Sequence, residues 1–372
     1  MFALKVKYFF INQLFIFLIK ILLIMYVFFL NLYFKIMETE VYTAKDFISD
    51  QEVKWCPGCG DYSILKQMQS ILPEINIPKE KIVFVSGIGC SSRFPYYMNT
   101  FGMHSIHGRA PAVATGMKLA NPELNIWLIT GDGDGLSIGG NHLIHLFRRN
   151  VDINVLMFNN EIYGLTKGQY SPTSNEGLRT KSSPMGVVDH PFNPLSLALG
   201  SSATFVARTL DRNPIHLREM LKRSQEHKGT SFLEIYQNCI IFNDAIFEDY
   251  SNKETKNKAS LYLEHGKPLL FGKNNEFAVI LEGFSPKIVS VFDVDENQLW
   301  IHDERDKTKA YILTQMFDNP LESGIPRPFG VLYSEDRTTY NDSVIEQIKT
   351  AKKQKTQSIN DLIAGNNTWV VE

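Results

Sequence analysis

The chain has 372 residues, of which 44% are hydrophobic, enough to fill one large α/β domain with an appendage or two domains. Its 38 basic residues are balanced by 40 acidic ones, which leaves no polycationic surface for nucleic acid. Four cysteines are too few to staple a secreted scaffold of this length, and are more typical of metal ligands or catalytic groups than of disulfides.

An apolar segment opens the chain. Residues 8–36 carry only two charges, Lys20 and Lys35, and eight of the 25 Phe precede Met37. This would be long enough for a membrane helix, which needs roughly 20 apolar residues. However, no small-residue cleavage site follows, METEVYTAKDF is typical of a cytoplasmic start, and the Phe, Ile, Leu, Lys, Asn and Tyr bias is that of translated AT-rich DNA. We interpret residues 1–36 as the product of a misassigned start codon and expect a cytoplasmic protein, with a membrane anchor as the alternative.

Short apolar runs alternate with amphipathic stretches between residues 60 and 240. The expected strands are almost continuously apolar, as is typical of strands covered on both faces, and lie at 82–86, 126–130, 154–158, 204–207 and 232–236. The expected helices lie at 61–72, behind an Asp61 cap, and at 110–120, 137–149, 193–199 and 213–227. The alternation predicts an α/β fold with a doubly wound, mostly parallel sheet, in which ligands bind at the carboxyl ends of the strands.

The character of the chain changes near residue 250. A polar run at 251–258 precedes short segments with Pro-rich turns that carry no strong motif. We therefore divide the chain into the apolar segment 1–36, a main domain over 37–250 and a C-terminal extension over 251–372. The extension is expected to pack on the core or on a partner subunit.

The four cysteines form a second pattern. Cys56 and Cys59 are a CxxC pair in WCPGCG, a spacing that lets two thiolates reach one metal centre. Cys90 in GIGCSSR and Cys239 in QNCIIF each follow an expected strand, so both emerge at the same edge of the sheet. Four thiolates in one place bind either zinc or an iron–sulfur cluster, and spacing does not decide between them. Scattered buried cysteines are the simpler alternative, which is disfavoured because no cysteine is left over.

A third pattern points to a diphosphate held by magnesium. One expected strand runs into Gly-Asp-Gly-Asp-Gly at 131–135, and the next ends in Asn159 and Asn160. A diphosphate needs a divalent cation, for which Mg²⁺ with oxygen ligands is suited. Asp132 offers a carboxylate, Asn160 a side-chain carbonyl and Ile162 a backbone carbonyl. The glycines let the backbone approach the phosphates, and the N-terminus of the following helix adds partial positive charge.

Gly-Asp-Gly followed by paired asparagines one βα unit later is the thiamine-diphosphate signature. In residues 40–245 it occurs among the runs WCPGCG, SGIGCSSR, HGRAPAVATGMKLANP, GDGDGLSIGGNHLIHLFRRN, NNEIYGLTKGQYSPTS and QNC, in that order. Together these runs resemble the β subunit of 2-oxoacid:ferredoxin oxidoreductases. The resemblance implies the thiamine-diphosphate-binding fold, with thiamine diphosphate, Mg²⁺ and one 4Fe–4S cluster as cofactors. It favours the 2-oxoglutarate type, with pyruvate or broad 2-oxoacid specificity as the alternative.

The resemblance also assigns roles to individual residues. The four cysteines become the cluster ligands, and Asp132, Asn160 and the Ile162 carbonyl become the magnesium ligands. Arg93 falls where relatives place a cation near the substrate, and a guanidinium there could hold a carboxylate bidentately; an ordinary ion pair is the alternative. His107 matches a contact near the reactive ring of the cofactor. The matched cofactor contacts are Ser91, His107, Gly108, Gly131, Gly133, Asp134, Gly164, Leu165 and Thr166.

The implied activity is the oxidative decarboxylation of 2-oxoglutarate to succinyl-CoA and carbon dioxide, with coenzyme A as acyl acceptor and ferredoxin as electron acceptor. Thiamine enzymes also need a glutamate against the aminopyrimidine ring, and related enzymes place it in a second α/β domain for which this chain shows no candidate. The cysteine count leaves none for a further ferredoxin-type cluster. The chain is therefore expected to require an α partner that supplies the pyrimidine and γ-like domains, in an α₂β₂ assembly.

Three other classes of protein stay open at this point. A zinc-binding module would explain the cysteines but not the pairing of Asp132 with Asn160. A non-oxidative thiamine enzyme would explain the magnesium motif but leave the cysteines idle. A membrane redox subunit rests only on residues 1–36.

Overall fold

The computed structural model describes residues 19–29, 42–354, 358–365 and 369. The chain divides into two compact units, residues 1–43 and 44–372. In the first unit, residues 19–29 are helical, with exposed side chains. None of the helices in the described ranges combines the length and apolarity needed to cross a bilayer. Most of the segment 1–36 lies outside the described residues, so its interpretation stays a prediction.

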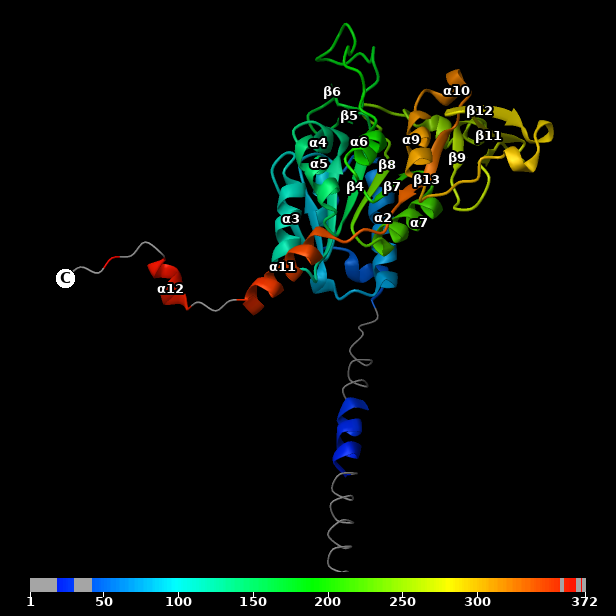
Figure 1. Cartoon of the computed structure of the whole chain (residues 1–372). Helices are drawn as coiled ribbons and strands as arrows, with labels where there is room; N and C mark the ends of the chain where they lie inside the picture. The colour runs from blue at the N-terminus through cyan, green and yellow to red at the C-terminus, as the bar shows by residue number, and fades with distance from the viewer. Residues whose placement is uncertain (1–18, 30–41, 355–357, 366–368, 370–372) are drawn as a thin grey trace, which may run out of the picture. The chain divides into compact units, whose positions relative to one another are not determined.

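An eight-stranded sheet is the framework of the second unit (Figure 1). Its strands run in the order β2-β1-β3-β4-β8-β7-β13-β9, and all neighbours are parallel except β7 and β13. This confirms the predicted α/β fold with a mostly parallel sheet. The strands are β1 Ile82–Ser86, β2 Phe101–His104, β3 Asn125–Gly131, β4 Ile153–Asn159, β7 Phe205–Leu210, β8 Thr230–Tyr236, β9 Ser260–Tyr262 and β13 Arg327–Ser334.

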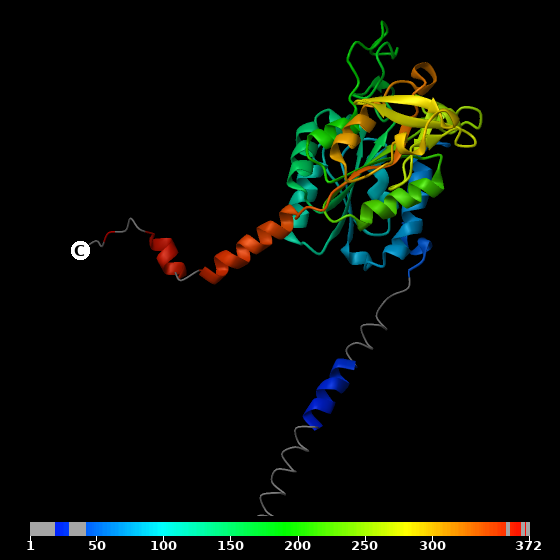
Figure 2. The ribbon, with the colours of Figure 1, turned by 45° about the vertical axis from the view of Figure 1, so that its right-hand side comes forward.

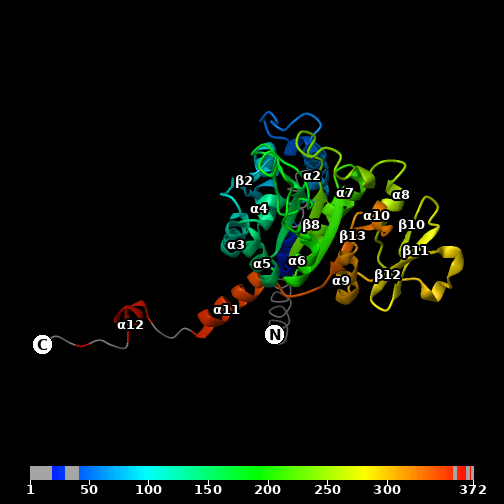
Figure 3. The ribbon, with the colours of Figure 1, turned by 90° about the horizontal axis from the view of Figure 1, so that it is seen from above.

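Helices cover both faces of this sheet. In Figure 3, α2 and α7 lie on one side of the sheet and α5, α6 and α9 on the other. The longer helices are α2 Asp61–Ile75, α3 Ala110–Ala120, α5 Gly140–Arg149, α6 Pro194–Gly200, α7 Pro214–Glu226, α9 Lys307–Gln315 and α11 Tyr340–Gln354. The short helical turns are η1 Ala44–Phe47, η2 Lys79–Lys81, η3 Ser91–Tyr97, α4 Asp132–Leu136, η4 Glu248–Tyr250, α8 Lys256–Ala259, η5 Val291–Asp293, η6 Glu296–Gln298, α10 Pro320–Ser323 and α12 Ile359–Ala364.

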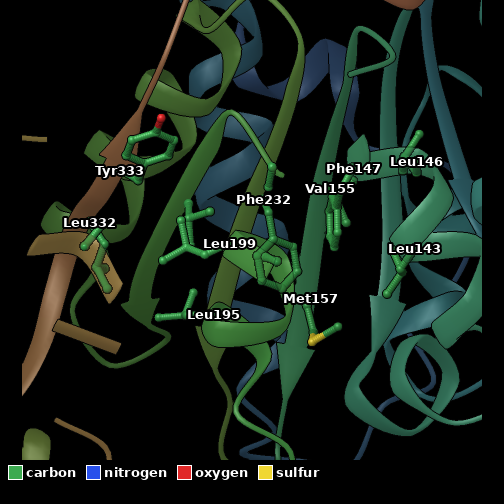
Figure 4. Packing of buried hydrophobic residues seen from close by; sticks show 14 of the residues in the cluster. Leu143, Leu146, Phe147, Val155, Met157, Leu195, Leu199, Phe232, Leu332 and Tyr333 are labelled. Carbon is green, nitrogen blue, oxygen red and sulfur yellow. The ribbon is translucent and has the colours of Figure 1, made fainter. Parts of the chain in front are cut away.

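The main core lies between the sheet and the helices of one face (Figure 4). Helix α5 shows the pattern that builds it, because its buried apolar residues recur three and four positions apart and face the sheet. Each fully buried Leu or Phe contributes roughly 1.5–3 kcal/mol to stability. The residues labelled in Figure 4 come from α5, β4, α6, β8 and β13, and are Leu143, Leu146, Phe147, Val155, Met157, Leu195, Leu199, Phe232, Leu332 and Tyr333.

The sequence predicted most of these elements, with two corrections in the helices. All five expected strands are present, and their ends differ from the prediction by at most three residues. Asp61 is not the N-cap of α2. The helix begins at Asp61 itself, and its N-cap is Gly60, which has no side chain to make a capping hydrogen bond. The helix expected at 137–149 begins only at Gly140, as α5, because residues 137–139 form a break after the separate short helix α4 at Asp132–Leu136.

The residues after 250 contribute to the main sheet. β13 lies between β7 and β9, and its carboxyl half pairs with β7 while its amino half pairs with β9. A separate antiparallel sheet, drawn mainly in yellow in Figure 2, consists of β10 Leu270–Phe271, β11 Phe277–Glu282 and β12 Ser285–Ser290. The C-terminal extension thus packs on the core, and a domain boundary at residue 250 stays a proposal.

Candidate cofactor site

Two cavities adjoin at the carboxyl ends of the parallel strands. The first has a volume of about 250 Å³ and the second about 440 Å³. The loops after β1, β3 and β4 contribute to the first cavity, and those after β1, β4 and β8 to the second. Four residues line both cavities and therefore form their common wall: Cys90, Asn160, Gly164 and Leu165.

The first cavity gathers almost every residue that was predicted to bind the cofactor or magnesium. Gly108 is the exception among them, since its backbone instead supports the cavity through Asp134. The hairpin β5 Ile162–Tyr163 and β6 Gln169–Tyr170 brings residues 164–166 to the cavity. The predicted residues that line it are Ser91, His107, Gly131, Asp132, Gly133, Asp134, Asn160, Ile162, Gly164, Leu165 and Thr166.

Asp134 holds three loops together at the floor of the first cavity. Its Oδ1 accepts hydrogen bonds from the backbone N–H of Ile88 (2.9 Å) and of Gly108 (2.7 Å). The same oxygen lies 2.8 Å from His107 Nδ1, and Oδ2 accepts from Thr130 Oγ1 at 2.7 Å. A carboxylate partner at Nδ1 keeps the proton on that nitrogen, which leaves Nε2 as the ring's acceptor. Asp134 therefore orients His107 and fixes the loop geometry.

Asp132 is the buried carboxylate of the predicted magnesium site. Its side chain is buried, and this burial raises the pKa of Asp132. Thr173 Oγ1 donates to Asp132 Oδ2 at 2.7 Å and also lies 3.0 Å from Asn159 Oδ1. A cation bound here would offset the desolvation of the carboxylate, because opposite charge favours the ionised form.

The two asparagines at the end of β4, Asn159 and Asn160, face different surroundings. Asn159 faces the protein interior, where its Nδ2 donates to Glu234 Oε1 at 2.8 Å. Asn160 lines the cavities, and its Oδ1 accepts from the backbone N–H of Ile162 at 3.2 Å. Between them and β5, Glu161 adopts a left-handed φ of 55°, and its burial raises the pKa of Glu161 to about 8. The turn thus directs Asn160 and Ile162 toward the same cavity as Asp132.

In the Gly-Asp-Gly-Asp-Gly turn at 131–135, Gly133 is a position that no larger residue could occupy without a clash. A Cβ there would come within 2.2 Å of the ring of Tyr163, whose hydroxyl donates to the Gly133 carbonyl at 2.9 Å. The ring of Tyr163 also lies edge-on to that of His107, with centroids 6.3 Å apart. This close approach brings the α4 turn and the β5 hairpin together over the first cavity.

The second cavity is lined by all four cysteines, Cys56, Cys59, Cys90 and Cys239. None is in a disulfide, and burial raises the pKa of Cys90 to about 12 and also raises the pKa values of Cys59 and Cys239. In the part of the chain that the structure describes, no three His, Cys, Asp or Glu side chains are grouped as they would be around one metal ion. The four cysteines instead line a cavity. Gly164 lies close to two of them, because a Cβ added to it would be 3.5 Å from Cys239 Sγ and 3.6 Å from Cys90 Sγ.

Arg93 lines the second cavity and not the first. Its Nη1 donates to the carbonyl oxygen of Lys54 at 3.2 Å. The guanidinium therefore lies on the cysteine side of the common wall. Its predicted contact with a substrate carboxylate stays a proposal.

Several residues with a supporting role were not predicted from the sequence. Trp55 Nε1 donates to the Cys90 carbonyl at 2.7 Å and so ties the CxxC loop to the loop after β1. Gln237 Nε2 donates to Cys59 Sγ at 3.3 Å, and Thr173 contacts Asp132 as described above. All three lie inside runs that carry the resemblance, but nothing in their type marks them as supporting groups. Only their neighbours in space do so.

The chain is similar to several known proteins. Residues 87–235 match the family model "Thiamine pyrophosphate enzyme, C-terminal TPP binding domain". The 2-oxoglutarate oxidoreductase subunit KorB of Mycobacterium tuberculosis is 49% identical over 334 residues, which cover 88% of each chain. The 2-oxoacid:ferredoxin oxidoreductase 1, subunit beta, of Aeropyrum pernix is 49% identical over 190 residues, 51% of this chain and 60% of that one.

A solved structure is similar over most of the chain. It is that of the 2-oxoglutarate:ferredoxin oxidoreductase from Magnetococcus marinus with 2-oxoglutarate, coenzyme A and succinyl-CoA bound. The match has a TM-score of 0.70 and 31% sequence identity, and covers 88% of this chain and 97% of that chain. The similarity therefore extends beyond the cofactor motifs into the C-terminal extension.

Proposed function

The chain belongs to the β-subunit family of the 2-oxoacid:ferredoxin oxidoreductases, and we propose that it converts 2-oxoglutarate and coenzyme A to succinyl-CoA and carbon dioxide, with ferredoxin as electron acceptor. Family membership rests on the relative that is 49% identical over 88% of its length. The preference for 2-oxoglutarate is supported by the names of that relative and of the similar solved structure. A cytoplasmic location stays a prediction from the sequence.

The observation that carries the proposal is the common wall between the two cavities. One cavity offers oxygen ligands and the other four thiols, and Cys90, Asn160, Gly164 and Leu165 line both. A carbon-based electron donor in the first cavity would thus lie directly beside an acceptor in the second. A non-oxidative thiamine enzyme has no use for this arrangement, and a zinc-binding module has no use for the first cavity.

Thiamine diphosphate, when bound, supplies the electron sink that lets carbon dioxide leave a 2-oxoacid. Asp132, the Asn160 side chain and the Ile162 carbonyl would hold Mg²⁺, because they bring oxygen ligands to one cavity. Gly133 lines the same cavity, where a diphosphate would lie against the α4 turn. His107, oriented by Asp134, would present Nε2 toward the cofactor and take up or release a proton there.

The four cysteines would hold a 4Fe–4S cluster. They line one cavity of about 440 Å³, which suits a multi-atom cluster better than a single zinc ion with ligands at about 2.3 Å. Because burial raises the pKa of Cys59, Cys90 and Cys239, cluster assembly must release protons as these cysteines become thiolates. Gly164 lines both cavities and carries no side chain, so it would leave little protein between two cofactors bound there.

The chain would act with an α partner. We propose that this partner supplies the pyrimidine and γ-like domains in an α₂β₂ assembly, and that ferredoxin collects the electrons. Arg93 is proposed to hold a substrate carboxylate near the common wall, where the partner would complete the pocket.

The test is ferredoxin reduction by the anaerobically purified complex of this chain with its α partner. With coenzyme A present, 2-oxoglutarate should give a higher kcat/KM than pyruvate or branched-chain 2-oxoacids, and the chain alone should give no turnover. The protein should be brown and bleach on reduction. A colourless zinc protein would refute the cluster, and carbon dioxide release without ferredoxin reduction would indicate a non-oxidative thiamine enzyme.

A further inference from the structure

The side-chain amide of Gln237 links residues that are proposed ligands in the two cavities. Gln237 is the first residue after β8, and it is 1% exposed. Its Oε1 accepts a hydrogen bond from Asn160 Nδ2 at 2.8 Å. Its Nε2 donates to Cys59 Sγ at 3.3 Å and to the carbonyl of Asn238 at 2.6 Å. The amide therefore touches a proposed magnesium ligand with one end and a proposed cluster ligand with the other.

The orientation of this amide is determined by its partners. Asn160 Nδ2 can only donate, so the Gln237 atom facing it must be the oxygen. The carbonyl of Asn238 can only accept, so the other end must be the nitrogen. A cysteine thiolate is likewise an acceptor. The reverse orientation would place two donors against each other and two acceptors against each other.

The same residue is also joined to the asparagine pair through its backbone. The Gln237 N–H donates to the Asn159 carbonyl at 2.9 Å, and Asn243 Nδ2 donates to the Asn160 carbonyl at 2.9 Å. Because Nδ2 of Asn160 binds Gln237, its Oδ1 points away from Gln237 and accepts from the backbone N–H of Ile162. That oxygen is the atom proposed to bind magnesium.

We propose that Gln237 is a positioning residue that acts on both cofactor sites. Its N–H raises the reduction potential of the cluster through Cys59, and its carbonyl sets the Asn160 side chain for magnesium. The inference rests on the proposed function, because it needs both groups. Hydrogen bonds to cluster sulfurs stabilise the reduced, more negative state and so tune its potential. Indirect partners of metal ligands typically change metal affinity by ~10–100-fold.

Backbone N–H groups also face the cysteine sulfurs, at Cys239 in particular. They cannot be removed by substituting a side chain, whereas Gln237 can. Its two ends can also be separated: Gln237→Glu, once its carboxyl is ionised, keeps an oxygen for Asn160 but loses the donor to Cys59. Gln237→Met keeps the length and volume and loses both.

The experiment is an EPR-monitored redox titration of the holo α/β complex, together with titration of thiamine diphosphate binding against Mg²⁺. Gln237→Met should lower the cluster potential and weaken Mg²⁺-dependent binding by about 10-fold. Gln237→Glu, titrated at a pH at which its carboxyl is ionised, should lower the potential but retain Mg²⁺ affinity close to that of the wild type. Gln225→Met is the matched control: its Oε1 accepts from Asn125 Nδ2 and Asn154 Nδ2 at the amino ends of the strands, away from both cavities.

An unchanged potential in both Gln237 variants would overturn the proposal. So would loss of the cluster from both while the wild type stays loaded, because the amide would then be needed only to assemble the site. A potential shift of the same size in the Gln225 control would also overturn it. Absence of a cluster from the wild-type complex would instead contradict the proposed function, so the two failures can be told apart.

Discussion

The two cavities at the carboxyl edge of the sheet are built in different ways. The first is a network of completed hydrogen bonds, in which Asp134 accepts four and both asparagines at the end of β4 have partners. The second is lined by four thiols that are not joined to one another and by apolar side chains such as Ile240 and Phe242. Hydrogen bonds within the chain therefore already fix the shape of the first cavity. In the second cavity, no such network joins the four thiols.

The difference indicates which site depends on its cofactor. A preorganised oxygen site should bind and release magnesium and thiamine diphosphate without changing the protein much. The four thiols of the second cavity would be linked to one another only by a bound cluster. Cluster binding should therefore stabilise the loops that carry them.

The largest effect is expected from Cys239→Ser. A cluster with one thiolate removed should not assemble in its native form, so ferredoxin reduction should be lost completely. Mg²⁺-dependent binding of thiamine diphosphate should be unchanged, because Cys239 lines only the second cavity. Visible absorption and a calorimetric titration of the cofactor measure the two separately. Loss of both together would mean that the cavities are not independently built.

Asp132→Ala should give the converse result. Removing the only carboxylate among the proposed magnesium ligands should weaken cofactor binding by more than the ~100-fold that loss of an indirect partner can cause. The brown colour and the EPR signal of the cluster should be retained. Asp152→Ala, at the amino end of β4, is a control for the loss of one acidic residue. Equal cofactor affinity in Asp132→Ala and wild type would exclude Asp132 as a ligand.

A smaller effect is expected from Thr173→Val, which is nearly isosteric but cannot donate to Asp132. Losing that 2.7 Å hydrogen bond should weaken Mg²⁺-dependent binding by about 10-fold and leave the cluster potential unchanged. Thr173→Ser, which retains the hydroxyl, should restore most of the affinity. If Val and Ser behave alike, the hydroxyl is not what holds Asp132 in position.

The smallest effect concerns pH. Because burial raises the pKa of Glu161 from 4.5 to about 8, the folded chain binds this proton more tightly than the unfolded chain. Stability from this group is full below pH 4.5 and is lost as pH rises toward 8. As pH rises from 4.5 to about 8, the free energy of unfolding of Glu161→Gln should therefore increase relative to that of the wild type by on the order of 1–3 kcal/mol.

The measurement is the midpoint of urea unfolding at a series of pH values, without thiamine diphosphate or Mg²⁺. The exposed Glu226→Gln variant should follow the wild type throughout. Parallel pH profiles for Glu161→Gln and wild type would show that the buried carboxyl does not titrate as expected.

The sequence predicted the first cavity better than the second. Asp132, Asn160 and the glycines could be found because their roles depend on short motifs at strand ends, and parallel strands end at one edge of the sheet. The convergence of the cysteines followed from the same rule. The spacing of the cysteines in the sequence could not predict the size of the cavity that they line, because that size depends on the packing of three loops. Arg93 was expected near the substrate, and its place on the cysteine side depends on such packing.

Two further features needed the structure because they depend on distant pairings. The amide contacts of Gln237 join residues 77 and 178 positions away, which no local pattern records. The role of β13 was also missed, because a short apolar run that contains Pro328 and Gly330 is a weak strand signal. Its partners lie more than sixty residues earlier in the chain.

The position of β13 has a consequence for how the protein is made. During synthesis β7 can pair with β8 as soon as both have emerged, but its other edge stays open until residues 327–334 follow. The buried Arg208 can pair with Glu234 of β8 early, but its Nη1 gains its 3.3 Å hydrogen bond to the Pro328 carbonyl only when β13 has emerged. An open strand edge is a template for aggregation. Nascent chains that stop before β13 should thus be substrates for chaperones and proteases, although both cofactor motifs are already complete.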